Sequence, residues 1–356
     1  MKKDLMCILL IMIMTLTCSC SKDSETTAQT QADSSGAKTV VDLSGDEVKI
    51  PDDITGIITR VNTASFVAAM GKADLLKGTY KYMKNDKWSE FMYPALGNSE
   101  NFPSTPTAES FYELDANVCI WSDRETAESL RSQGISALTM TINTPEDMRA
   151  VADLMGEIFN NRKWSENWNS YYSETLAEIE KRVNNIEDKK TVYYVHGAGN
   201  EGIYHTAAGG TISETWIVQS GGNFATHDTT GFGIDITPEE LINIDPEVIV
   251  IGGIYYESMK DTFYSDTTLS QISAVKNNNI YNVPVGLIPW DQYGVEYPLL
   301  CLWTAMTLYP EQFEDIGIID ETIKFYEDFC GVKLTKEQAQ YMIEGKAPDG
   351  GKLLDE

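Results

Sequence analysis

The sequence predicts an α/β protein: two α/β lobes with mainly parallel sheets, bridged by one long rigid helix. In both halves of the chain, strand-like runs alternate with helical patterns, which is typical of βαβ units. Between the halves, apolar residues from Trp164 to Ile186 recur at steps of three or four residues. That stripe predicts one helix of about 23 residues, roughly 34 Å long. The length of 356 residues is also that of two domains of ordinary size.

Composition excludes several functional classes. Hydrophobic residues make up 42% and aromatic residues 10% of the chain, which excludes wholesale disorder. Asp and Glu number 54 against 27 Lys and Arg, so the net charge is −27. This balance argues against nucleic acid as a partner, because phosphates need basic patches. It also argues against an anionic membrane surface as the main partner.

The first residues predict export. Lys2 and Lys3 precede an apolar run over 5–16, followed by Cys18, Ser19 and Cys20. This is the pattern of a secretory signal peptide, expected over 1–19, and it is shorter than the about 20 residues that a membrane-spanning helix needs. A cysteine at the end of such a run resembles a bacterial lipobox, so we expect lipidation at Cys20, with Cys18 as the second choice. The protein is then extracytoplasmic and anchored to the cell membrane by an N-terminal lipid.

Residues 20–38 are expected to form a lipid-anchored flexible tether. From residue 21 onward this stretch has no large aliphatic or aromatic side chain, so it cannot offset the entropy of ordering. Beyond it, three cysteines lie far apart, at 119, 301 and 330. We interpret them as small buried hydrophobic residues, since they form no disulfide framework.

The N-terminal lobe is expected over 39–160. Its elements follow from alternation, turn residues and caps: a hairpin over 40–50, strands over 54–61, 117–121 and 136–140, and helices over 64–70, 125–133 and 145–160. Thr144 is expected to open the last helix with a capping box.

The bridging helix is expected over 161–188 and the C-terminal lobe over 189–356. Strands are predicted at 191–195, 247–251 and 280–284, with helices between them.

A related phrase occurs in each lobe. Residues 107–121 (TAESFYELDANVCIW) and 237–251 (TPEELINIDPEVIVI) share a Thr-x-Glu opening, an Asp eight residues after the Thr, and a following strand. With SGGNFA at 220–225 and LCLWTAMTLYPEQF at 300–313, this resembles the substrate-binding proteins of ABC importers for iron siderophores, haem and cobalamin. The resemblance covers about residues 40–333. It implies two lobes bridged by a rigid helix, with the ligand in a cleft between them.

Signatures of catalysis are absent from the sequence. There is no GxSxG elbow, Walker loop or HExxH motif, and the glycines of 197–202 fit no nucleotide fingerprint. Only three histidines exist, at 196, 205 and 227, which argues against a His-rich metal cage. We therefore expect no catalytic residues, no metal site and no cofactor of the protein's own. A cleft enzyme built on carboxylates, or a surface sensor on the same scaffold, is the alternative from a different class.

Ligand contacts are expected in loops at the strand ends that face the cleft. These loops lie at 60–65, 80–93, 121–124, 196–206, 254–259 and 286–293. Flat aromatic rings crowd them and suit a macrocycle or an aromatic chelate. The candidate ligand-binding residues are Arg60, Tyr80, Tyr82, Trp88, Trp121, Arg124, Tyr204, His205, Tyr255, Trp290 and Tyr293.

The numbers of arginines and aromatic residues in these loops restrict the charge that the ligand can carry. A tris-catecholate complex would need several converging cations, whereas two arginines suit a neutral or weakly charged ligand. An iron chelate of the siderophore type is our first choice, with a corrinoid or haem as the alternative, and hydroxamate-type complexes are compatible with this charge. Haem needs an axial Tyr, His or Met. Tyr82 with Met83, and Tyr204 with His205, are the candidates for that ligand.

The resemblance also assigns a role to two acidic residues. Glu109 and Glu239 stand where members of that family present a carboxylate to their membrane permease, and such charges fix the docking register. Either residue alone is equally explained as a helix N-terminal charge favoured by the macrodipole. The predicted protein is thus a monomeric solute-binding lipoprotein that delivers a small metal chelate to an ABC permease.

Overall fold

The computed structural model describes residues 38–79, 87–102, 105–196, 202–253 and 256–353. The predicted signal peptide, the lipidation site at Cys20 and all but the last residue of the tether lie outside the described residues. Among those described, no helix is long and apolar enough to cross a membrane.

The chain first forms the predicted hairpin, from β1 (Lys38–Val41) and β2 (Glu47–Ile50), with Val40 opposite Val48. The Asp42 carboxylate accepts hydrogen bonds from the backbone N–H groups of Ser44 and Asp46, which closes the turn. One face of the hairpin is therefore apolar and buried, as its alternation predicted.

The first sheet has five parallel strands in the order β5-β4-β3-β6-β7. They are β3 (Ile57–Thr59), β4 (Leu76–Thr79), β5 (Glu100–Asn101), β6 (Val118–Trp121) and β7 (Ser136–Thr139). The α-helices of this lobe among the described residues are α1 (Val61–Val67), α3 (Lys87–Met92), α4 (Ala108–Glu113), α5 (Arg124–Ser132) and α6 (Pro145–Ile158). The strands β3 and β6 are buried along their whole length, which explains their continuous apolar runs.

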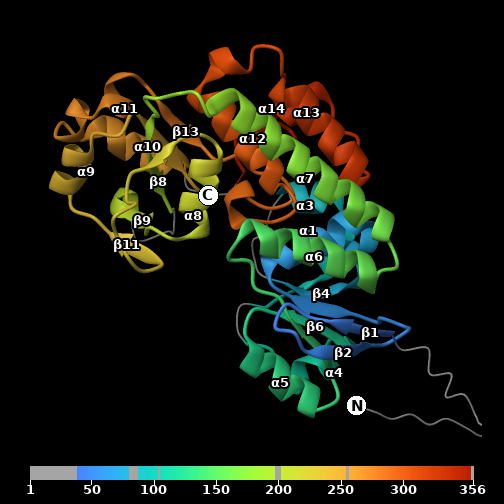
Figure 1. Ribbon diagram of the computed structural model, residues 1–356. Helices are drawn as coiled ribbons and strands as arrows, with labels where there is room; N and C mark the ends of the chain where they lie inside the picture. Colours follow the sequence, from blue (N-terminus) through green and yellow to red (C-terminus); the bar gives the residue numbers. More distant parts are fainter. Residues whose placement is uncertain (1–37, 80–86, 103–104, 197–201, 254–255, 354–356) are drawn as a thin grey trace, which may run out of the picture. The chain divides into compact units, whose positions relative to one another are not determined.

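The predicted long helix is α7 (Arg162–Val183). Its stripe at Trp168, Tyr172, Ile179 and Val183 is buried, and it packs against α6 and α12 (Tyr297–Leu308). In Figure 1, α12 lies beside the upper part of α7 and α6 lies near its lower end. The apolar spacing therefore predicted both the helix and its buried face.

The second sheet has four parallel strands in the order β10-β8-β12-β13. They are β8 (Thr191–Val195), β10 (Asn223–Phe224), β12 (Val248–Ile251) and β13 (Ile280–Asn282), beside a small antiparallel pair of β9 (His205–Ala207) and β11 (Gly233–Asp235). Its helices are α8 (Ile212–Gln219), α9 (Pro238–Ile244), α10 (Tyr256–Ser265) and α11 (Ser273–Lys276). With the edge strand β5 set aside, both sheets place their strands in the chain order second, first, third, fourth.

The sequence motif shared by residues 107–121 and 237–251 has the same local structure in both lobes. Thr107 and Thr237 each open a short helix with a capping box. After each helix an aspartate, Asp115 or Asp245, adopts a left-handed backbone with φ of 49° or 45°. Each turn then leads into the third strand of its sheet, β6 or β12.

The C-terminal segment packs back on the first lobe. It comprises α13 (Ile318–Phe325), a π-helical turn at Tyr326–Cys330 and α14 (Lys336–Ile343). The indole N–H of Trp88 donates to the Lys346 carbonyl (2.7 Å), and the Tyr93 hydroxyl donates to the Cys330 carbonyl (2.8 Å). The last part of the expected lobe over 189–356 is therefore hydrogen-bonded to the first lobe, and the expected domain bounds stay a prediction. Cys119, Cys301 and Cys330 are free and buried, as predicted.

Candidate functional site

The carboxyl ends of the two sheets meet at one loop. This loop, residues 286–296, follows β13 and contacts helices that leave β3 and β4. The Val295 N–H donates to Oγ of Ser65 in α1 (3.0 Å), and Oγ of Ser89 in α3 donates to the Leu287 carbonyl (2.5 Å). A Cβ on Gly294 would lie 2.4 Å from the Ser65 Oγ, so this close approach requires glycine. Ligand loops of open α/β sheets lie at such strand ends.

On the first lobe, Arg60 and Trp121 form one unit. Arg60 directly follows β3 and is exposed, while Trp121 ends β6 and is buried. The guanidinium lies 5.6 Å from the centroid of the Trp121 ring, within the range of a cation–π interaction. Arg60 makes no ion pair within the described part of the chain. Its charge is therefore available to a ligand.

On the second lobe, a buried carboxyl lies at the strand ends. Asp291 is 2% exposed, and its Oδ2 accepts from the Tyr194 hydroxyl (2.8 Å) and the Gly253 N–H (3.0 Å). A Cβ on Gly252 would lie 2.1 Å from that oxygen, so the carboxyl occupies space that only glycine leaves. Burial raises the pKa of Asp291. Its Oδ1 has no hydrogen-bond partner among the described residues.

Beside Asp291, histidines and aromatic rings gather. The rings of His196 and His205 are 5.6 Å apart, and Phe232, which is 76% exposed, lies 6.2 Å from His196. Nδ1 of His205 pairs with Oδ1 of Asp235 at 2.9 Å. Within the described ranges, no three His, Cys, Asp or Glu side chains are arranged to hold a metal ion. This surface can therefore stack on a flat ligand and hydrogen-bond to it.

Two predicted tyrosines join this surface. Tyr204 is half-buried, and burial raises its pKa. The hydroxyls of Tyr293 and Ser213 are hydrogen-bonded at 2.6 Å. Tyr293 has a left-handed backbone with φ of 56°, a strained conformation for a bulky residue. Such strain is retained where the surroundings fix a side chain in one place.

Three predicted contacts are engaged within the protein, and their role in ligand binding stays a prediction. Trp88 and Trp290 are fully buried. Arg124 pairs with Asp46 (2.6 Å) and Glu128 (2.8 Å) of its own lobe, so its charge is already engaged. Tyr80, Tyr82 and Tyr255, like Met83, lie outside the described residues.

The sequence analysis did not select Asp291, Phe232 or His196 as candidate ligand-binding residues. His196 directly follows a predicted strand, which was a usable signal, but the sequence marked it only as the start of a loop. Asp291 lies inside a predicted ligand loop, and nothing in its neighbours distinguishes it from other carboxylates. Phe232 lies in a connection for which the sequence offered no site.

Glu109 and Glu239 occupy equivalent places. Each is exposed and is the second residue of its capped helix, α4 or α9. Their role in docking stays a prediction.

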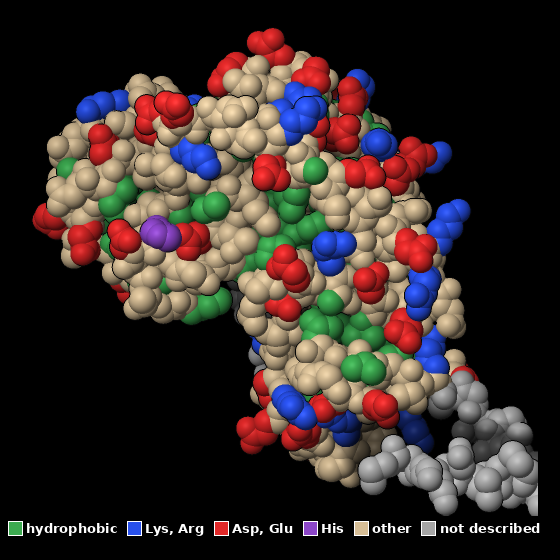
Figure 2. All heavy atoms as spheres, in the orientation of Figure 1, with side chains coloured by type: hydrophobic (Ala, Val, Ile, Leu, Met, Phe, Trp, Pro, Cys, Tyr) green, Lys and Arg blue, Asp and Glu red, His purple; other side chains and the backbone are tan. Residues whose placement is uncertain are grey.

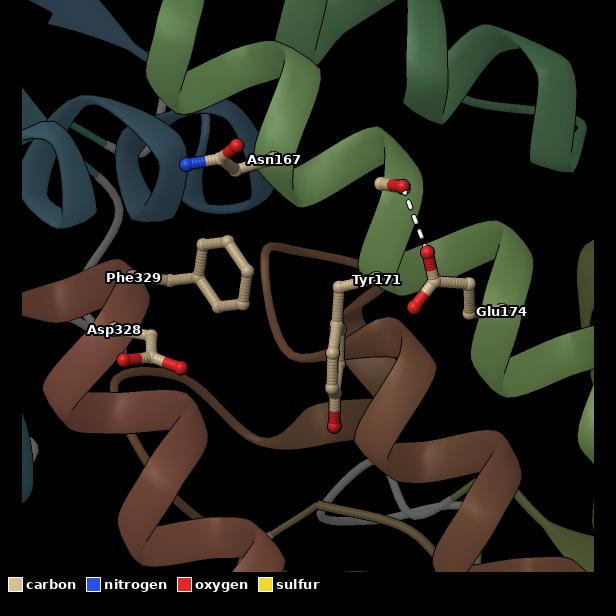
Figure 3. A pocket seen from close by; sticks show the side chains of 6 residues that line it. Asn167, Tyr171, Glu174, Asp328 and Phe329 are labelled. Carbon is tan, nitrogen blue, oxygen red and sulfur yellow. Dashed lines mark hydrogen bonds between the residues drawn. The ribbon is translucent and has the colours of Figure 1, made fainter.

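A separate cavity of about 350 Å³ lies between α7 and the turn at 326–330. Its lining residues are Asn167, Ser170, Tyr171, Glu174, Asp328 and Phe329. Figure 3 shows Asp328 and Glu174 on either side of the Tyr171 ring. Since none of these residues follows a strand, this cavity is distinct from the site at the strand ends.

A sequence profile described as periplasmic binding protein matches residues 107–285. The chain belongs to the periplasmic binding protein family. Proteins of this family are the extracytoplasmic solute-binding components of ABC transporters. No curated protein matches the sequence.

Solved structures share the fold of this periplasmic binding protein. A periplasmic solute-binding protein from Veillonella parvula has a TM-score of 0.75 at 24% identity, covering 88% of this chain and 98% of its own. A Helicobacter pylori protein solved with Ni(II) bound has a TM-score of 0.70 at 17% identity, covering 86% and 99%. A haem-binding protein has a TM-score of 0.59 at 16% identity, covering 76% and 90%. At these identities the likeness confirms the two-lobed fold.

Proposed function

We propose that this periplasmic binding protein captures an iron chelate of the siderophore type between its lobes and delivers it to an ABC permease. The observation that carries the proposal is the Arg60–Trp121 unit at the strand ends of the first lobe. It offers one uncompensated cation on an aromatic support. The second lobe contributes imidazole and phenyl rings and a buried carboxyl.

The charge of this surface favours a neutral or weakly anionic chelate. Arg124, the other cation expected at the strand ends, is neutralised by Asp46 and Glu128. A tris-catecholate complex carries several negative charges and would leave most of them unpaired here, at a large desolvation cost. A ferric hydroxamate complex, with little or no net charge, fits one cation and several rings better.

Haem or a corrinoid is the second candidate. It is favoured by Tyr204 and His205, which adjoin each other at the second lobe and offer an axial ligand. His205 already uses Nδ1 for Asp235, and a Cβ on Gly233 would lie 2.9 Å from its Nε2. Axial ligation by His205 therefore requires the ring to move. Since solved structures of this fold include one with Ni(II) bound and one of a haem-binding protein, the fold alone does not select the ligand.

A ligand screen tests the proposal. Tryptophan fluorescence is measured during titration with ferrichrome (a neutral ferric trihydroxamate), haem and cobalamin, because Trp121 lies under Arg60. We expect saturable quenching by ferrichrome beyond that caused by the iron-free ligand. Quenching only by haem or cobalamin would select the second candidate, and no response to any probe would contradict both.

A further inference from the structure

Glu296 is a fully buried carboxyl group at the junction of the lobes. It directly precedes α12 and is 0% exposed. Its Oε1 accepts from the Leu287 N–H (2.7 Å) and from the Tyr326 hydroxyl (2.9 Å). Its Oε2 has no hydrogen-bond partner among the described residues. The carboxyl thus joins the two ends of the loop that runs from Leu287 to Glu296.

The surroundings of this carboxyl are neutral. The titratable groups that face it are Tyr326 and Cys330 from the turn at 326–330, and Tyr93 from the segment after α3. No Lys, Arg or His forms an ion pair with it in the described part of the chain. Packing is tight, since a Cβ on Gly286 would lie 1.8 Å from the Tyr326 hydroxyl and 3.1 Å from the Glu296 Oε1.

These surroundings disfavour the charged form. Burial raises the pKa of Glu296 to about 7, although hydrogen bonds from Tyr326 and from backbone N–H groups act to lower it. Ionisation strengthens both hydrogen bonds to Oε1, but it leaves negative charge on Oε2 with no donor. A buried charge of this kind is relieved only if the structure opens to water.

The loop closed by Glu296 carries contacts to both lobes. Leu287 and Val295 are bonded to Ser89 and Ser65 of the first lobe. Asp291, between them, is bonded to Tyr194 and Gly253 at the strand ends of the second lobe. A change in the closure of this loop therefore reaches the candidate ligand surface.

We propose that Glu296 is a positioning residue of the ligand site: its neutral carboxyl closes the loop 287–296 and holds Asp291 at the ends of β8 and β12, and its ionisation loosens the loop. The link to ligand binding rests on the proposed function, because it takes this loop to line the cleft. Loop closure itself is a property of the ligand-free protein.

Amide hydrogen exchange tests the closure without a ligand. The reporting amides are those of Leu287, which contacts Glu296, and Gly253, which contacts Asp291. Exchange is measured from pH 6 to pH 8 in the wild type and in Glu296→Gln, which keeps an acceptor for Leu287. After correction for the intrinsic pH dependence of exchange, we expect protection to fall about tenfold in the wild type and to stay constant in Glu296→Gln. The exposed Glu311→Gln is the matched control and should follow the wild type.

Two further measurements separate positioning from mere stability. Tyr326→Phe removes a donor that lowers the pKa of Glu296, so the midpoint of the wild-type profile should shift to higher pH. The affinity for whichever probe binds in the ligand screen should fall from pH 6 to pH 8 in the wild type only. Equal pH profiles of exchange in the wild type and Glu296→Gln would overturn the inference even if a ligand binds. If the pH dependence of exchange occurs in the wild type but not in Glu296→Gln, and none of the probes binds, loop closure by Glu296 is supported and the proposed ligand is contradicted.

Discussion

At the scale of single residues, the two arginines predicted for the cleft have different interaction partners. Arg124 lies within reach of Asp46 of the hairpin and Glu128 one turn along α5, so carboxylates of its own lobe neutralise it. Arg60 has only the Trp121 ring beneath it. Its positive charge is therefore not compensated by a carboxylate of the described residues, and it suits a ligand that carries some negative charge.

This contrast gives a prediction with an internal control. Arg60→Gln should weaken the binding of ferrichrome about tenfold, because it removes a charge-assisted contact to a hydroxamate oxygen worth roughly 1.5–3 kcal/mol before compensation by water. Arg124→Gln should leave affinity unchanged. The measurement is the dissociation constant from fluorescence titration at fixed ionic strength. Equal losses in the two variants would mean that general charge, rather than a contact of Arg60, attracts the ligand.

Sequence pattern placed Arg60, Trp121 and Trp88 alike in loops expected at the cleft. In the structure Arg60 and Trp121 contact each other, whereas Trp88 is fully buried. The burial of Trp88 depends on the carbonyl of Lys346, which lies 258 residues away in the chain. No local pattern carries information about such a contact, so aromatic residues of the core and of the site look alike in sequence.

At the scale of elements, local signals were the dependable ones. The capped helices α4 and α9 were predictable because Thr and Asp act within one turn of their own backbone. The π-helical turn at Tyr326–Cys330 was not, since its end is held by distant donors. The Trp164 indole donates to the Phe329 carbonyl (2.9 Å), and the Tyr93 hydroxyl donates to the Cys330 carbonyl (2.8 Å). These bonds fasten the C-terminal segment to the first lobe and to α7.

The hydrogen bond from Tyr93 to the Cys330 carbonyl is expected to contribute measurably to the free energy of unfolding. Tyr93→Phe removes only the hydroxyl and leaves the Cys330 carbonyl without that donor, so the free energy of unfolding should fall by about 1 kcal/mol. Tyr112→Phe is the control, because Tyr112 is 74% exposed on α4. Urea denaturation followed by tryptophan fluorescence provides both values. A loss no larger than that of the control would show that the bond does not stabilise this packing.

At the scale of the whole molecule, the excess of negative charge is spread over a wide surface. Figure 2 shows acidic side chains scattered over one face of the protein, with fewer basic ones among them. Most carboxylates therefore act as solvated surface charges that favour solubility. Glu109 and Glu239 differ from the rest in one respect. Each lies in the first turn of the helix that precedes the third strand of its sheet, and the two sheets have the same strand order. The two glutamates therefore occupy equivalent positions in the two lobes.

This pairing predicts that ligand capture and delivery can be separated. Glu109→Arg combined with Glu239→Arg should abolish uptake of the chelate into cells that contain the permease, because like charges then oppose the cations of the docking surface. Affinity in solution should be unchanged, since both residues lie in first turns of helices rather than at the strand ends.

Glu125→Arg combined with Glu337→Arg provides the matched control. Glu125 and Glu337 are also exposed in the first turns of their helices, α5 and α14, so reversing their charge loses the same interaction with the helix macrodipole. Uptake lost equally in both double variants would assign the effect to net charge, whereas affinity lost only with Glu109 and Glu239 would place these residues at the ligand site instead of the permease.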